Sequence, residues 1–175
     1  MNAGSLRRLD DLIGDGEDLF LAVSHGTVAV LVIAAVFYRY VLSDPLTWTE
    51  EFVVIVFTWM LFIGLASGFR TRMHIRIDGL LIVLPTKGRA VLGAIAVAVT
   101  MFTLAALAWL GTEQALIMLD TQTPMMRISA GWAVSALPVG AFLSCIHVLR
   151  HAVCDGLSEA LWPSDLIGSA EGEGL

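Results

Sequence analysis

Residues 39–85 read RYVLSDPLTWTEEFVVIVFTWMLFIGLASGFRTRMHIRIDGLLIVLP, and this stretch decides the fold. The run from 52 to 69 has no charged side chain and, at about 1.5 Å of rise per residue, is long enough to cross a membrane as a helix. Thr47 and Glu50 have the spacing of a capping box, with Thr47 as the N-cap. The arginines that begin at Arg70 follow the run, so the predicted helix is acidic at one end and basic at the other.

The composition of the whole chain indicates a membrane protein. Of its 175 residues, 57% are hydrophobic and 15% are charged, and the mean hydropathy is +0.81. The basic residues form no patch with aromatics between them, which argues against nucleic acid as a partner. Cys145 and Cys154 fit neither a disulfide framework nor a zinc pattern. No nucleotide-binding glycine motif or nucleophile elbow is present, so an enzyme is not expected.

Four apolar runs of transmembrane length predict an all-α integral membrane protein. They cover about 19–38, 52–69, 90–110 and 130–149. We expect residues 1–18 to be a polar cytoplasmic tail rather than a cleaved leader, residues 19–153 to form the membrane domain, and residues 154–175 to be a disordered cytoplasmic tail. Pro138 lies within the fourth run and predicts a kink there.

The distribution of lysine and arginine predicts the orientation. Eight of the ten basic residues fall on the side of the two termini and the 70–89 loop, and only Arg39 and Arg127 fall on the other side. The positive-inside rule therefore places both termini in the cytoplasm. The 70–89 loop has apolar residues at helical spacing with His74 and Asp78 four apart, which predicts an amphipathic helix lying in the membrane interface; an irregular loop is the alternative.

Several residues are candidates for special roles. Small residues recur every four positions in the first, second and fourth runs, as at Gly64 and Gly68, and favour close helix packing. Glu50 and Glu51 are neighbours that point about 100° apart on a helix, so they suit the helix start better than an acid–base pair. His25 and His147 could ligate a haem between helices, and His151 lies four residues after His147, a spacing open to metals. Each is also a common interfacial residue, and no cofactor is expected.

The central stretch resembles the small membrane subunit, of the DctQ type, of tripartite ATP-independent periplasmic (TRAP) transporters. The resemblance covers roughly residues 20–150. It rests on Arg39, the WTEE motif at 48–51, WMLFIGLASGFR at 59–70, HIRID at 74–78, Thr123-Pro124, Trp132 and LPVG at 137–140. The residues Ile128-Ser129-Ala130-Gly131 stand where the family often has a proline before the tryptophan.

The resemblance implies a scaffold subunit in the bacterial inner membrane. In that family the small subunit packs against a large permease that holds the substrate and sodium sites, and a periplasmic protein delivers an organic anion such as a carboxylate. The expected structural or subunit-contact residues are Arg39, Trp48, Glu50, Glu51, Trp59, Gly64, Gly68, Arg70, His74, Asp78, Pro138 and Gly140.

Two alternatives come from other classes of protein. One is a haem-binding membrane anchor of an oxidoreductase, which would use His25 and His147. The other is the small subunit of a tricarboxylate-type tripartite transporter, which is expected to lack the WTEE to HIRID series. The transported compound is not encoded here, because the residues that select it are expected on other chains.

Overall fold

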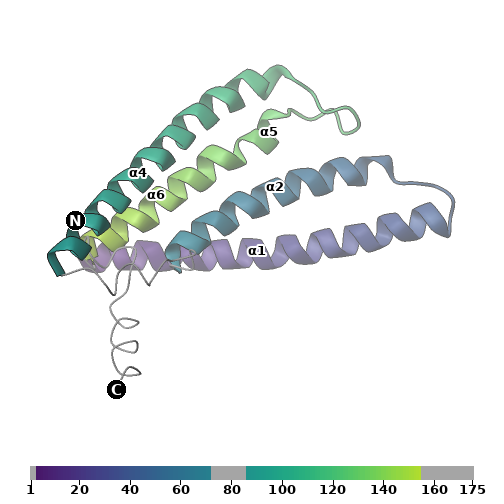
Figure 1. Ribbon diagram of the computed structural model, residues 1–175. Helices are drawn as coiled ribbons and strands as arrows, with labels where there is room; N and C mark the ends of the chain where they lie inside the picture. Colours follow the sequence, from purple (N-terminus) through teal and green to yellow (C-terminus); the bar gives the residue numbers. More distant parts are fainter. Residues whose placement is uncertain (1–2, 72–85, 155–175) are drawn as a thin grey trace.

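The computed structural model describes residues 3–71 and 86–154 (Figure 1). In these residues the chain forms four long helices: α1 (Ala3–Tyr40), α2 (Thr47–Arg70), α4 (Thr86–Ile117) and α6 (Ala136–Cys154). The short 3₁₀ helix η1 (Met118–Asp120) and the short helix α5 (Gly131–Val134) lie between α4 and α6. All four long helices are long and apolar enough to cross a membrane, which confirms the predicted all-α, four-span fold.

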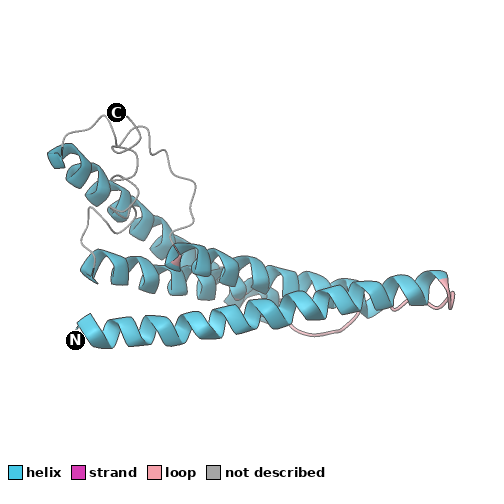
Figure 2. Cartoon of the chain, turned by 90° about the horizontal axis from the view of Figure 1, so that it is seen from below, coloured by secondary structure: helices cyan, strands magenta, loops and turns pink. Residues whose placement is uncertain are grey.

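The helices pack as a row rather than as a closed bundle. α1 packs on α2, α2 packs on α6, and α6 packs on α4, whereas α1 has far less contact with α6 (Figure 1). α1 and α4 are therefore the outer helices of the row. Figure 2 shows α1 running along one side of the molecule for its whole length. We call the end where α1 begins, α2 ends and α6 ends the terminal end, and the opposite end the loop end.

The first helix begins well before the apolar run that predicts it. The sequence predicts a polar tail over residues 1–18, whereas the structure continues α1 back to Ala3. Asp10 and Glu17 in this extension are only 3% and 4% exposed. The extension is thus packed against the rest of the chain, and the site described below explains why.

The fourth span is interrupted close to the predicted kink. α5 ends at Val134 and α6 starts at Ala136, so the break falls at Ser135, three residues before Pro138. Pro138 lies in the first turn of α6, where the missing N–H group leaves no hydrogen bond unmade. The break therefore places the proline where a helix tolerates it.

The backbones of α2 and α6 approach closely at Gly140. A Cβ atom at this position would lie 2.6 Å from the carbonyl oxygen of Phe62 and 2.7 Å from its Cβ. Only glycine allows the two backbones to approach this closely. The small-residue stripe of the fourth span is therefore used inside the chain. In contrast, a Cβ atom at Gly26 in α1 would have no neighbour within 4 Å.

The predicted interfacial helix cannot be compared with the structure over most of its length. Residues 72–85, with His74 and Asp78, lie outside the described residues, as does the carboxyl-terminal segment from 155 to 175. Both predictions therefore stay predictions.

Candidate functional site: polar clusters at the two ends of the helix row

A buried cluster of charged side chains joins three helices at the terminal end. His147 of α6 is fully buried, with its Nδ1 2.7 Å from Asp10 Oδ1 and its Nε2 3.0 Å from Glu17 Oε1. The second oxygen of each carboxylate faces an arginine: Arg150 Nε lies 3.3 Å from Asp10 Oδ2, and Arg70 Nε lies 3.6 Å from Glu17 Oε2. We call this group, with Asp18, the terminal cluster. Burial of Asp10 and Glu17 is tolerable because each faces an arginine as well as the histidine, whereas the Asp18 side chain is 59% exposed.

The sequence of α1 positions the acidic half of the terminal cluster. Asp10, Gly14 and Glu17 are spaced by four and three residues, so they share one face of the helix. Arg70 crosses this face at Gly14, where a Cβ atom would lie 2.2 Å from its Nη1. Its Nη2 donates to Asp18 Oδ1 at 2.5 Å. Glycine therefore provides the groove in which the guanidinium lies between two carboxylates.

The last turn of α2 receives a further partner from α6. The Nε2 of His151 donates to the carbonyl oxygen of Arg70 at 3.0 Å, and Arg150 Nη1 donates to His151 Nδ1 at 3.0 Å. The carbonyls of a helix's last turn lack intrahelical partners, so this contact satisfies one of them. A side chain of α6 thus binds a backbone carbonyl at the end of α2, in addition to the ion pairs of the terminal cluster.

At the loop end, Glu51 binds the loop between η1 and α5. Its Oε2 accepts hydrogen bonds from the backbone amides of Met125 at 3.0 Å and Met126 at 2.8 Å. The loop itself is closed by an antiparallel bridge between Gln122 and Ser129. A carboxylate that accepts two amide protons makes a strong, charge-assisted contact. Glu51 therefore holds α2 and this loop together.

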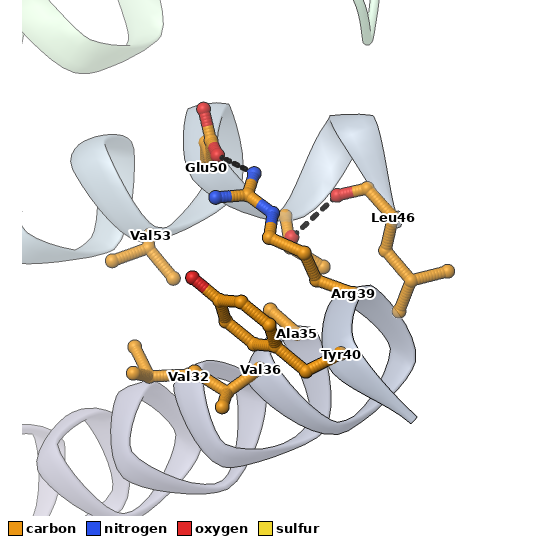
Figure 3. A pocket seen from close by; sticks show the side chains of 9 residues that line it. Val32, Ala35, Val36, Arg39, Tyr40, Leu46, Glu50 and Val53 are labelled. Carbon is orange, nitrogen blue, oxygen red and sulfur yellow. Dashed lines mark hydrogen bonds and ion pairs between the residues drawn. The ribbon is translucent and has the colours of Figure 1, made fainter. Parts of the chain in front are cut away.

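A second ion pair at the loop end joins α1 and α2. The guanidinium of Arg39 donates to Glu50 Oε1, and both side chains are more than half exposed. Figure 3 shows the pair above a pocket whose other walls include the apolar side chains of Val32, Val36 and Val53. Because the pair is exposed, it contributes little to stability and mainly orients the 41–46 connection.

The predicted capping box is wrong. α2 begins at Thr47 and its N-cap residue is Leu46, which makes no side-chain capping hydrogen bond. Glu50 instead pairs with Arg39, and Thr49 Oγ1 donates to the Leu46 carbonyl at 2.6 Å. The local spacing is overridden because both glutamates find partners on other segments of the chain.

The remaining predicted residues fall into three groups. Trp59 donates from its indole nitrogen to the carbonyl of Trp132 at 2.9 Å, and so joins α2 to α5. Trp48 is 42% exposed and packs edge-on against Phe52. The glycines at 64 and 68 lie in α2, where a Cβ atom at Gly64 would meet only Leu21, at 3.9 Å.

Inspection of the residues alone missed the terminal cluster. Asp10 and Glu17 were assigned to a tail, although their seven-residue spacing is a helical signal. His147 was considered as a haem ligand, but both of its ring nitrogens face carboxylates. His25 Nδ1 lies 2.7 Å from the Leu21 carbonyl on the same helix. The pair therefore has the geometry of structural polar contacts.

The two clusters leave the middle of the spans without ionisable groups that could line a pathway. In α2, α4 and α6 the described acidic and basic side chains lie toward the helix ends, whereas in α1 they extend from the amino-terminal end to Asp18, near the middle of the helix. Membrane pathways for ions and charged solutes usually carry buried ionisable groups or broken helices at mid-depth.

The comparisons agree with the family suggested by the sequence. The model of the family described as tripartite ATP-independent periplasmic transporters, DctQ component, matches residues 28–156. The chain is 27% identical over 130 residues to the C4-dicarboxylate TRAP transporter small permease protein of Rhodobacter capsulatus, covering 73% of this chain and 57% of that protein.

Two relatives from Vibrio cholerae are also similar. One is a C4-dicarboxylate TRAP transporter small permease protein, 32% identical over 82 residues, which are 47% of this chain and 35% of the relative. The other is a sialic acid TRAP transporter small permease protein, 24% identical over 145 residues, which are 83% of this chain and 84% of the relative. The matched regions thus span about a third to just over half of the two C4-dicarboxylate relatives described here. The match to the family model covers most of the four-helix region, and the chain belongs to the DctQ component family of the TRAP transporters, as a multi-pass protein of the bacterial inner membrane and not an enzyme.

Proposed function

We propose that this chain is the scaffold subunit of a sodium-coupled TRAP transporter that imports an organic anion. In this proposal it packs against a large permease subunit, and a periplasmic binding protein delivers the substrate. The observation that carries the proposal is the open row of helices. α1 stands out among the spans: only 6% of its most apolar stretch is buried within the described chain, against 17% for α2, 17% for the third span and 33% for the last.

The outer helices have more apolar surface than this chain alone can cover. Phe102 of α4 is 77% exposed and Ile33 of α1 is 70% exposed. Lipid can cover such side chains, and so can a neighbouring membrane subunit. If only lipid covered the outer helices, an open row would bury less surface than a closed bundle. An open row does, however, offer a long side against which a larger subunit can pack, and this chain would then extend the part of the transporter that stays fixed in the membrane.

The small residues of α1 support a partner on its outer face. Because a Cβ atom at Gly26 would have no neighbour within 4 Å among the described residues, this position leaves room for close approach by another helix. The corresponding position in α6, Gly140, is already used by α2. We therefore propose that the large subunit approaches the α1 side of the row.

The orientation follows from the charge distribution. The terminal end contains Arg70 and Arg150 and is followed by the basic 70–89 loop, whereas the loop end has only Arg39 and Arg127. By the positive-inside rule, the terminal end faces the cytoplasm and the Glu51 end faces the periplasm, where a delivery protein would dock. The substrate is proposed to be a carboxylate because the relatives are named for C4-dicarboxylates and sialic acid.

Co-purification tests the proposal. The tagged chain is extracted from native membranes in mild detergent, and mass spectrometry identifies and counts the proteins that accompany it. We expect one large polytopic permease per copy of this chain. A red complex with flavin or iron–sulfur subunits would instead support an oxidoreductase anchor and overturn the proposal, and so would a chain that purifies with no membrane partner in several detergents.

The proposed side of contact is tested by a matched pair of substitutions. Gly26→Leu would block close approach to α1, whereas Gly64→Leu faces Leu21 of the same chain. We expect Gly26→Leu to reduce recovery of the permease while leaving this chain folded. Equal recovery with the wild-type chain and with Gly26→Leu would mean that the permease binds elsewhere.

A further inference from the structure

Six side chains of the terminal cluster form an unbroken line of alternating charge. The line alternates between α6 and α1 for its first four members, then crosses to α2 and returns to α1. Its members, in order, are Arg150, Asp10, His147, Glu17, Arg70 and Asp18. His147 lies inside the line, between Asp10 and Glu17, and histidine is the side chain whose charge ordinarily changes near neutral pH.

The contacts of His147 indicate how many protons its ring carries. Each of its two ring nitrogens lies within hydrogen-bond distance of a different carboxylate oxygen, at 2.7 Å and 3.0 Å. A neutral imidazole has one N–H group, so one nitrogen would present a lone pair to an anionic oxygen. His147 is 0% exposed, which leaves no room for solvent to relieve that repulsion. With both carboxylates ionised, both contacts are favourable only when both ring nitrogens carry a proton.

We propose that His147 holds one exchangeable proton in this line and that this proton latches the amino-terminal part of α1 onto α2 and α6. With the proton, three cations face three anions. Without it, Asp10 and Glu17 are buried against a neutral ring, with one arginine each. The latch acts on residues 3–18, because Asp10, Glu17 and Asp18 are the side chains through which this part of α1 binds the arginines and the histidine.

Among the side chains that the structure describes, the other charged groups near the latch are either exposed or engaged elsewhere. Arg8, Asp11 and Asp15 of α1 are exposed to solvent. His151 is engaged with the Arg70 carbonyl and with Arg150. From α4, the described side chains that pack in the core with α6 near this end are apolar, as at Val97.

The sign of the pH dependence follows from the proton count. The docked helix binds one proton more than an undocked chain with a neutral imidazole, so docking takes up a proton. Raising the pH therefore weakens docking, by at most about tenfold in the docking equilibrium per pH unit for one linked proton. The latch is closed near pH 6, where the carboxylates are ionised, and opens as the pH rises and the histidine proton is lost.

Nitrogen NMR tests the protonation state directly. The full-length chain, labelled with ¹⁵N-histidine and reconstituted in lipid, is measured at pH 7, and the His147→Gln variant identifies the His147 signals among the four histidines. We expect two protonated ring nitrogens for His147. One protonated and one bare nitrogen would overturn the proposal.

Distance measurements test the latch itself. Spin labels are placed at Leu12→Cys and Val153→Cys, which are 69% and 60% exposed, after Cys145 and Cys154 are changed to serine. We expect a narrow distance distribution at pH 6 that broadens at pH 9, and a broad one at both pH values in His147→Gln. A wild-type distribution that is equally narrow at both pH values would overturn the latch.

A control pair separates opening of the latch from loss of the fold. Labels at Phe57→Cys and Phe142→Cys report on α2 and α6 near the loop end, where both side chains are exposed. We expect this distribution to stay the same at pH 6 and pH 9. If it broadens together with the first pair, the whole chain has loosened and the local latch is refuted. If His147→Gln does not fold, the wild-type pH series and the NMR measurement still decide.

Discussion

Replacing Gly140 with alanine should separate the two central helices of the row. The added Cβ atom would lie 2.6 Å from the Phe62 carbonyl oxygen and 2.9 Å from its carbonyl carbon, both of which are backbone atoms. Ordinary contacts of a Cβ atom begin at about 3.4 Å, so α2 and α6 would have to move apart by about 0.8 Å. A backbone inside a helix cannot move aside alone, so the whole interface shifts.

The cost should be measurable. Overpacking of this kind costs about 1–3 kcal/mol, and the lost contacts lie in one of the two most extensive interfaces between the described helices. Alanine is itself favoured over glycine in a helix by up to about 1 kcal/mol in water, which works in the opposite direction. We therefore expect a net loss of about 1–2 kcal/mol in the free energy of unfolding. Denaturation in mixed micelles, followed by tryptophan fluorescence, measures it.

Two other glycines provide matched controls. Gly26→Ala adds a Cβ atom in open space and Gly64→Ala adds one at an ordinary distance from Leu21, so both report the helix-propensity gain alone. We expect both variants to be at least as stable as the wild type. If Gly140→Ala is as stable as these two, the close approach of α2 and α6 does not exist in the membrane protein and the packing described here is wrong.

Three further substitutions test individual contacts. Arg39→Ala should change the free energy of unfolding by less than about 1 kcal/mol, because its pair with Glu50 is exposed; a larger loss in the same denaturation assay would mean that the pair is buried by another surface. Glu51→Ala should speed amide hydrogen exchange in the 121–130 loop about tenfold or more, because the Glu51 carboxylate accepts hydrogen bonds from two backbone amides of this loop. Unchanged exchange would show that Glu51 does not hold the loop to α2. Trp59→Phe should cost about 1 kcal/mol through the lost indole hydrogen bond, and calorimetry that finds no difference from the wild type would show that the bond is not formed.

The sequence was sufficient for the parts of the structure that depend on local pattern. Length and composition identify four spans, because a membrane helix must satisfy its own backbone and expose apolar side chains. Gly140 could be proposed as a packing residue from its small-residue spacing. Its actual neighbour, Phe62, could not, since helix rotation is set by the whole interface.

The polar contacts could not be read from local spacing, because they join residues far apart in the chain. Thr47 and Glu50 fit a capping box, yet Glu50 pairs with a residue of the preceding helix. Asp10 looks like part of a solvated tail until His147, 137 positions later, is placed beside it. The contact of a buried histidine with two carboxylates depends on tertiary packing. It forms because α1 extends back to Ala3 and so places Asp10 and Glu17 beside α6.

Reconstituted uptake tests the central proposal, that this chain is a required but non-conducting subunit, most directly. Liposomes containing the permease that co-purifies with this chain, with and without the chain, are supplied with the binding protein, a sodium gradient, and radiolabelled C4-dicarboxylates or sialic acid. We expect sodium-dependent uptake only when the permease and this chain are both present, and none with this chain alone. Uptake by this chain alone, or full uptake by the permease without it, would contradict the scaffold function proposed here.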